Sequence, residues 1–188
     1  MQTAQQSHNM AVSQSELFNI RKATPKDAQA VAELGTHVFT VTFGPSMQPT
    51  NLQTYLSKTY STSATTTEIQ NPNKDMLLAT STSGTILGFA LMTRGPPEPC
   101  IADIPKQVQL QRIYLHPSAQ GRGVGKLLIQ SIEEEARRQG FENLWLAVYE
   151  KNYKAIGIYE RLGFRKAGTH DFVTGTEVQT DLVMLKTL

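Results

Sequence analysis

The chain has 188 residues, of which 39% are hydrophobic and 18% charged, and its formal net charge is +2. This length fits one domain with a full core and is short for two. The weak positive charge, without a basic stripe interleaved with aromatics, argues against a nucleic-acid partner. No segment approaches the roughly 20 apolar residues that span a bilayer, so no membrane partner is expected.

The N-terminal segment 1–15 has neither a charged start nor an apolar stretch, so it does not resemble a secretion signal. We expect a disordered polar tail over 1–15 and one folded domain over 16–188. The single cysteine, Cys100, excludes an internal disulfide and favours a reducing compartment. The cytoplasm is the expected location, with nuclear entry left open. The four histidines are scattered without ligand spacing, so no metal site is expected.

The first half of the domain is predicted to contain both strands and helices. Thr24-Pro25-Lys26-Asp27 starts a helix, because threonine caps, proline suits the first helical position and an acid suits the first turn. The polar run 61–73 is interpreted as a connector. The run 94–106 holds four of the nine prolines and is predicted to be a loop, because proline cannot donate to a strand ladder. The other elements expected here are a strand at 16–23, a weaker helix at 52–60, and strands at 75–80 and 85–93.

In the second half, strands and helices alternate, which indicates a mixed α/β fold around one sheet. Gly140 and Gly163 are each expected to end a helix. The expected elements are strands at 108–115, 143–149, 164–172 and 180–185, and helices at 123–139 and 153–162.

The segment LHPSAQGRGVGKLL places glycines at 121, 123 and 125 between a strand and a helix. Backbone N–H groups of such a loop, together with the helix dipole, bind phosphate. A Walker loop is excluded because Lys126 is followed by leucine, and the spacing does not fit a dinucleotide fingerprint. Arg122 and Lys126 are candidates for further phosphate contacts or are solvated surface charges. The alternative is a tight turn without a ligand.

The segment RIYLHPSAQGRGVGKLLI resembles the coenzyme A pyrophosphate loop of the GNAT N-acetyltransferase superfamily, whose pattern is Gln/Arg-x-x-Gly-x-Gly/Ala. The segment NYKAIGIYERLGF resembles the helix that follows in that family. From Ile20 to the end, the chain is similar to bacterial spermidine/spermine N-acetyltransferases of the PaiA type, most clearly in TGTEVQTDLVMLKTL. The matching positions of the two motifs are Gln120, Gly123, Gly125, Asn152, Ala155, Tyr159, Gly163 and Phe164.

The resemblance implies a GNAT-like α/β domain with a mixed, mostly antiparallel sheet of about six or seven strands and about four helices. It implies acetyl-CoA as cosubstrate, no metal, and direct attack by a small primary amine in a ternary complex, with spermidine or spermine favoured. Tyr159 is the family's position for the general acid, although it also fits an aromatic core residue. The implied coenzyme contacts are Ile113, Tyr114, Leu115, Gln120, Gly121, Arg122, Gly123, Val124, Gly125, Lys126, Asn152 and Tyr159.

The sequence departs from the family at Gln109, where many relatives carry a glutamate. An amide cannot take a proton, so the base lies elsewhere, acts through water or is missing. Glu98 and Asp103 in the proline-rich loop are candidates for it. Candidates for an acceptor pocket are the acids Asp171, Glu177 and Asp181 in the final hairpin and the aromatics Tyr55 and Tyr60 in the first half, although such acids also fit a solvated face.

Two other functions stay open. One is acetylation of a peptide or protein N-terminus, an amino acid or a drug-like amine. The other is a coenzyme A-binding sensor or interaction module that has lost catalysis, which the uncharged Gln109 supports. A homodimer is also left open.

Overall fold

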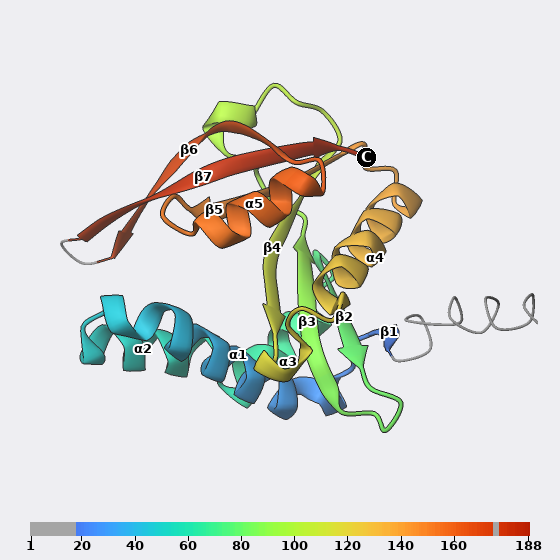
Figure 1. Ribbon diagram of the computed structural model, residues 1–188, viewed down its shortest axis with the longest axis vertical. Coiled ribbons are helices and arrows are strands. Elements are labelled where there is room, and N and C mark those ends of the chain that lie inside the picture. The colour runs from blue at the N-terminus through green and yellow to red at the C-terminus, as the bar shows by residue number, and fades with distance from the viewer. Residues whose placement is uncertain (1–17, 175–176) are drawn as a thin grey trace, which may run out of the picture.

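The computed structural model describes residues 18–174 and 177–188 and shows a seven-stranded sheet with the order β1-β2-β3-β4-β5-β7-β6 (Figure 1). All neighbouring strands are antiparallel except β4 and β5, which are parallel. The expected mixed, mostly antiparallel sheet is confirmed. The strands are β1 (Asn19–Lys22), β2 (Lys74–Thr80), β3 (Ile86–Thr93), β4 (Gln107–Leu115), β5 (Asn143–Tyr149), β6 (Arg165–Thr174) and β7 (Glu177–Thr187).

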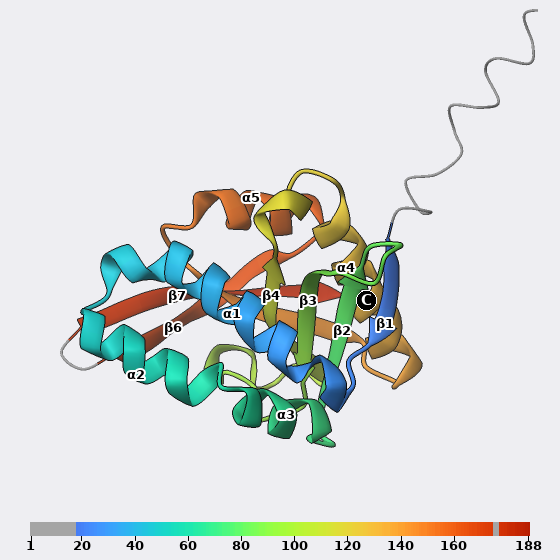
Figure 2. The ribbon, with the colours of Figure 1, turned by 90° about the horizontal axis from the view of Figure 1, so that it is seen from below.

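Different helices cover the two faces of the sheet (Figure 2). On one face lie α1 and α3 with α2 beside them, and on the other face lie α4 and α5. Strand β2 shows the consequence, since Leu77 and Ala79 belong to the core under α4 while Met76 and Leu78 pack against α1. A strand buried on both faces is apolar throughout, as β2 is. The helices are α1 (Ala28–Phe43), α2 (Pro49–Thr59), α3 (Thr62–Gln70), α4 (Val124–Arg138) and α5 (Tyr153–Arg161).

The prediction of a connector at 61–73 is wrong, because most of that run is helix α3. Ser61 caps this helix by accepting a hydrogen bond from the Ala64 backbone N–H at 3.2 Å. Thr65 and Ile69, one turn apart, turn inward: Thr65 is buried and Ile69 packs against the core under α1. A narrow buried stripe was enough to fix the helix, although the run as a whole is polar.

The other predicted elements are confirmed with shifts at their ends. The run 94–106 is a loop with one short turn at Pro99–Ile101. Strands β6 and β7 are longer than predicted, whereas β1 begins at Asn19. The predicted tail at 1–15 lies outside the described residues. No helix in the described ranges combines the length and apolarity needed to cross a bilayer.

Strand β4 pairs with β5 only at its beginning. The register joins Gln107, Val108 and Gln109 of β4 to β5 and stops there. On its other edge β4 stays paired with β3 as far as Leu115, with a bulge where Leu110 and Arg112 oppose successive β3 residues. The sheet therefore opens between β4 and β5, and the β4 edge from Leu110 to Leu115 keeps backbone groups that β5 does not satisfy.

Candidate active site

The glycine loop joins β4 to α4 through two left-handed residues. Gly121 has φ of 74° and Gly123 has φ of 84°, and Gly123 is the residue before the first turn of α4. No side chain caps that helix, so its first N–H groups remain available. A Cβ added at Gly121 or Gly123 would meet no protein atom within 4 Å. The loop therefore faces open space with the positive end of a helix, which suits an anion.

A cavity of about 230 Å³ lies against this loop and unites three separate parts of the chain. The end of β4, the glycine loop with the start of α4, and one side of α5 all contribute to its wall. Its lining is mainly apolar apart from the loop backbone, Lys126 and Tyr159. The lining residues are Ile113, Leu115, Ala119, Gly121, Gly123, Gly125, Lys126, Ile129, Ala155, Ile158 and Tyr159.

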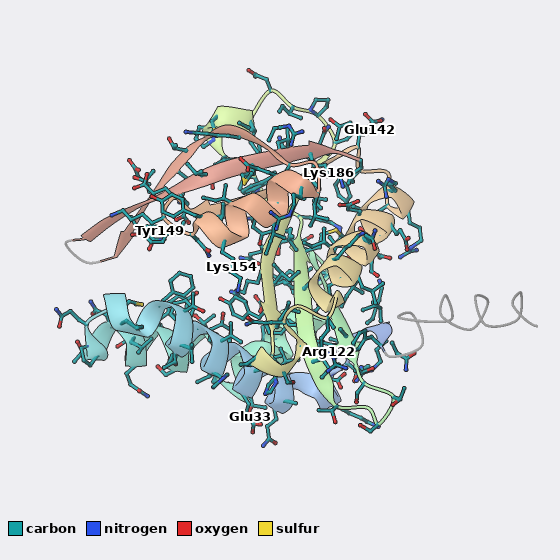
Figure 3. All side chains as sticks on the ribbon, viewed as in Figure 1. Glu33, Arg122, Glu142, Tyr149, Lys154 and Lys186 are labelled. Carbon is teal, nitrogen blue, oxygen red and sulfur yellow. The ribbon has the colours of Figure 1, made fainter. Side chains whose placement is uncertain are left out.

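Some residues expected to contact the coenzyme point away from this cavity. The guanidinium of Arg122 lies 5.1 Å from the Phe18 ring centroid and donates to the Ser118 carbonyl oxygen at 3.4 Å, beside the loop (Figure 3). Val124 is fully buried in the core, and Gln120 is exposed at the end of the turn before the loop. Neither lines the cavity.

Helix α5 brings Tyr159 to the cavity wall. Asn152 caps that helix, because its side-chain oxygen accepts a hydrogen bond from the Ala155 backbone N–H at 3.2 Å. The Tyr159 ring packs edge-on against Phe164 at 5.8 Å, and its hydroxyl has no hydrogen-bond partner among the described residues. Burial raises the pKa of Tyr159 to about 12, and nearby Tyr114 adds to the rise. The hydroxyl is therefore protonated at neutral pH and can donate a proton.

A second polar cluster lies on the opposite face of β4, under α1 and α3. The Tyr60 hydroxyl donates to the Tyr114 hydroxyl at 3.0 Å. Arg112 donates to Glu68 at 2.6 Å, and its guanidinium lies 5.6 Å from the Tyr60 ring centroid. Tyr60 is predicted for the acceptor pocket and Tyr114 as a coenzyme contact, but their meeting with Arg112 and Glu68 is not predicted, because Glu68 belongs to the run interpreted as a connector. A capping serine followed by inward residues one turn apart was the available signal.

The acids proposed for the acceptor side have different surroundings. Glu98 accepts a hydrogen bond from, or pairs with, His170 Nδ1 at 2.9 Å. Asp103 is exposed and makes no hydrogen bond or ion pair with any described residue. Gln109 is half-buried, and its side chain also makes no hydrogen bond with any described residue, so its amide group is free. Asp171 is exposed and accepts from the Thr180 hydroxyl at 2.9 Å.

The hairpin β6–β7 presents Asp181 beside the Glu98–His170 pair. Asp181 is the ladder partner of both His170 on β6 and Tyr149 near the end of β5 (Figure 3). Burial raises the pKa of the Asp181 carboxyl, while a hydrogen bond from Gln179 and the nearby His170 act to lower it. Asp171 is next to His170 in the strand and therefore faces the other side. The side chain of Glu177 lies outside the described residues.

Within the described ranges, no three histidine, cysteine or acidic side chains gather as metal ligands would. Cys100 is exposed and lies against Gly168, where an added Cβ would approach its sulfur to 2.6 Å.

Comparisons with known proteins agree on one family. The acetyltransferase (GNAT) family model matches residues 46–164. A protein of Lactobacillus delbrueckii subsp. lactis, named as an uncharacterized N-acetyltransferase in the pepI 3′ region, is 30% identical over 90% of this chain and 96% of its own. A ribosomal protein bS18-alanine N-acetyltransferase of Salmonella typhimurium is 38% identical over 32% of this chain and 41% of its own.

Among solved structures, the fold is similar to that of a PaiA N-acetyltransferase from Thermoplasma acidophilum in complex with coenzyme A. The TM-score is 0.73, with 21% identity over 91% of this chain and 99% of that one.

Proposed function

Since this chain belongs to the GNAT acetyltransferase family, and is thus an acetyl-CoA-dependent N-acetyltransferase, we propose that its acceptor is a primary amine on a small, positively charged molecule. A polyamine such as spermidine or spermine is the first candidate. The cosubstrate part of the proposal is carried by the cavity where the open edge of β4, the glycine loop and Tyr159 meet. The acceptor part is carried by the carboxyl groups of Glu98 and Asp181 beside His170.

The residues around the cavity fit the cosubstrate. Backbone N–H groups of the loop and the first turn of α4 would hold the pyrophosphate, in the space that Gly121 and Gly123 leave open. The β4 edge after Gln109 would pair with the amide groups of the pantetheine arm, since β5 leaves that edge free. When bound there, acetyl-CoA supplies an activated acetyl thioester. Lys126 lines the cavity and would add charge near the phosphates.

Tyr159 would donate the proton that the departing sulfur requires. Its pKa of about 12 keeps the hydroxyl protonated at neutral pH, and its lack of another partner leaves the proton free. The apolar wall formed by Ile113, Leu115 and Ile158 would exclude water from this donor. Asn152 contributes through the cap that fixes α5 and so the place of Tyr159.

The amine would attack directly, without an acyl-enzyme. Gln109 cannot remove a proton, but its free amide oxygen can accept a hydrogen bond from a neutral amine. Glu98 is held by His170 on β6, so its carboxylate is directed to the side of the β6–β7 hairpin that carries His170 and Asp181, here called the hairpin wall, rather than into the opening between β4 and β5. We infer that the acceptor nitrogen enters uncharged and that its surplus proton leaves through water.

The hairpin wall supports a positively charged acceptor. Glu98 and Asp181 lie on either side of His170, on the sheet face opposite α5. Two carboxyl groups there would attract a second ammonium group of the acceptor, at a distance from the reacting nitrogen.

A second candidate acceptor is the N-terminal amine of a peptide or protein. The local similarity to the bS18-alanine N-acetyltransferase of Salmonella typhimurium favours it, although it covers only 32% of this chain.

The first prediction concerns the glycine loop. Gly123→Val should weaken acetyl-CoA binding by about tenfold or more, because a branched side chain would fill the space proposed for the phosphates and strain the left-handed backbone. Calorimetric titration measures the dissociation constant. Gly84→Val is the matched control: Gly84 has φ of 86°, and its Cβ would also meet no atom within 4 Å.

Both glycine variants should lose similar stability, but only the Gly123 variant should lose coenzyme affinity. Equal affinities in the two variants would contradict the loop's assignment.

The second prediction concerns the proton donor. Tyr159→Phe should lower kcat by about 100-fold while changing the coenzyme dissociation constant less than about twofold. Because the wild-type hydroxyl has a pKa of about 12, it stays protonated throughout the neutral and mildly alkaline range. Wild-type kcat should therefore not fall as the pH is raised to about 10. A fully active phenylalanine variant would remove Tyr159 from this role.

The third prediction tests the acceptor class. Thiol release from acetyl-CoA, measured over a panel of amines, should be fastest with spermidine or spermine and slower with a monoamine of similar length. A peptide with an N-terminal alanine serves as the competing substrate. Faster release with the peptide would favour the second candidate, and no release with any amine, despite tight coenzyme binding, would favour a sensor without catalysis.

A further inference from the structure

The opening between β4 and β5 has two sides, and Tyr159 occupies only the coenzyme side. Ile113 and Leu115 line the coenzyme cavity, so Tyr114 between them points to the other face of β4. There its ring packs edge-on against Phe89 at 5.4 Å. Because the coenzyme fills one side, the acceptor must reach the reaction centre from the side of Tyr114.

The Tyr114 hydroxyl keeps its own proton available. In the hydrogen bond between the two tyrosines, Tyr60 donates and Tyr114 accepts, at 3.0 Å. A hydroxyl has one proton and two lone pairs, so Tyr114 retains its proton and one lone pair for another partner. Burial raises the pKa of Tyr114, so the group is neutral at physiological pH.

The donor to Tyr114 is itself held firmly. A Cβ at Gly35 would lie 2.5 Å from the Tyr60 ring, so α1 approaches that ring as closely as a bare backbone allows. The Arg112 guanidinium covers the ring at 5.6 Å and is fixed by Glu68. Tyr60 is 6% exposed, and burial strongly raises its pKa, so it remains a proton donor. This packing fixes the position of the hydroxyl from which Tyr114 receives its hydrogen bond.

Tyr159 lines the same cavity as Ile113 and Leu115, which are the neighbours of Tyr114 on β4, so the two tyrosines lie on opposite sides of one short stretch of strand. Tyr114 also adds to the raised pKa of Tyr159. The gap left where β5 departs from β4 lies between them. The reaction centre thus has one tyrosine on the coenzyme side and one on the acceptor side.

Nearby charge favours an uncharged nitrogen at this point. Glu68 pairs with Arg112 at 2.6 Å and with Lys74 at 2.5 Å, so two cations share one carboxylate. The surplus positive charge lies next to Tyr60 and disfavours an ammonium group there. A neutral amine is the form that can attack.

We propose that Tyr114 is a further catalytic residue, whose hydroxyl, oriented by Tyr60, holds the neutral acceptor amine on the side of the opening opposite Tyr159. This inference rests on the proposed amine acetylation. The free lone pair of Tyr114 accepts one N–H of the amine and leaves the nitrogen lone pair directed at the acetyl carbon. As the C–N bond forms and the C–S bond breaks, the surplus proton on nitrogen passes to water, and the proton of Tyr159 passes to sulfur. The Tyr159 phenolate then takes a proton back from water, which restores the enzyme. A carboxylate at position 109 would help to position the amine. This chain has glutamine there, and Tyr114 supplies that positioning instead.

The test compares three phenylalanine variants. Tyr114→Phe should lower kcat/KM for the amine about tenfold, the cost of one hydrogen bond near 1.4 kcal/mol, while the dissociation constant for acetyl-CoA stays within about twofold. Tyr60→Phe should lower the same parameter less, because Tyr114 remains but is free to rotate. The double variant should be no worse than Tyr114→Phe alone, since Tyr60 acts only through Tyr114.

Tyr153→Phe is the matched control. Tyr153 is 76% exposed at the start of α5, and its hydroxyl bonds to no described residue, so this variant should match the wild type. If the wild type is active and the Tyr114→Phe variant is equally active, the role of Tyr114 is overturned, while the proposed function stands. Additive losses in the double variant, or losses of amine and coenzyme affinity in parallel, would also overturn that role. A wild type inactive with every amine would overturn the proposed function together with this inference.

Discussion

The interaction on which the molecule depends is the parallel pairing of β4 with β5 and its end at Gln109. Three paired positions hold the two halves of the sheet together, and beyond them β4 keeps β3 as its partner but has none on the β5 side as far as Leu115. A strand edge without a partner normally invites aggregation or needs cover. Here the same edge leads into the glycine loop and forms one wall of the cavity, so its free backbone groups are directed toward a ligand rather than toward solvent.

This opening also explains why two tyrosines from opposite faces of one sheet can serve one reaction. In a continuous sheet, Tyr114 on β4 and Tyr159 on α5 would be separated by backbone. Where β5 diverges, Tyr159 lines the same cavity as Ile113 and Leu115, the strand neighbours of Tyr114, and Tyr114 adds to the raised pKa of Tyr159. The charges are divided in the same way: Arg112 and Lys74 share Glu68 near β4, while Glu98 and Asp181 lie toward the hairpin. A long acceptor with one neutral and one charged nitrogen fits that division.

Much of this could be predicted from sequence, because the decisive signals are local. The glycine spacing in 120–125 predicts the loop, in which Gly121 and Gly123 adopt positive φ. Asparagine before a helix predicts the cap that Asn152 forms. The acceptor side could not be predicted in this way. Glu68, in the mostly polar helix α3, and Tyr60, just before that helix, reach Arg112 and Tyr114 from more than forty positions away. The pairing of Glu98 with His170 likewise depends on how a proline-rich loop folds onto a distant hairpin. Such contacts are set by tertiary packing, which no local pattern encodes.

The most direct test of the account is a crystal structure of the protein grown with acetyl-CoA. The account predicts the pyrophosphate on the backbone amides of Gly121 to Lys126 and the pantetheine arm along β4 beyond Gln109. It also predicts the sulfur within hydrogen-bonding reach of the Tyr159 hydroxyl. A coenzyme bound elsewhere, with the glycine turn empty and the β4 edge unpaired, would contradict it.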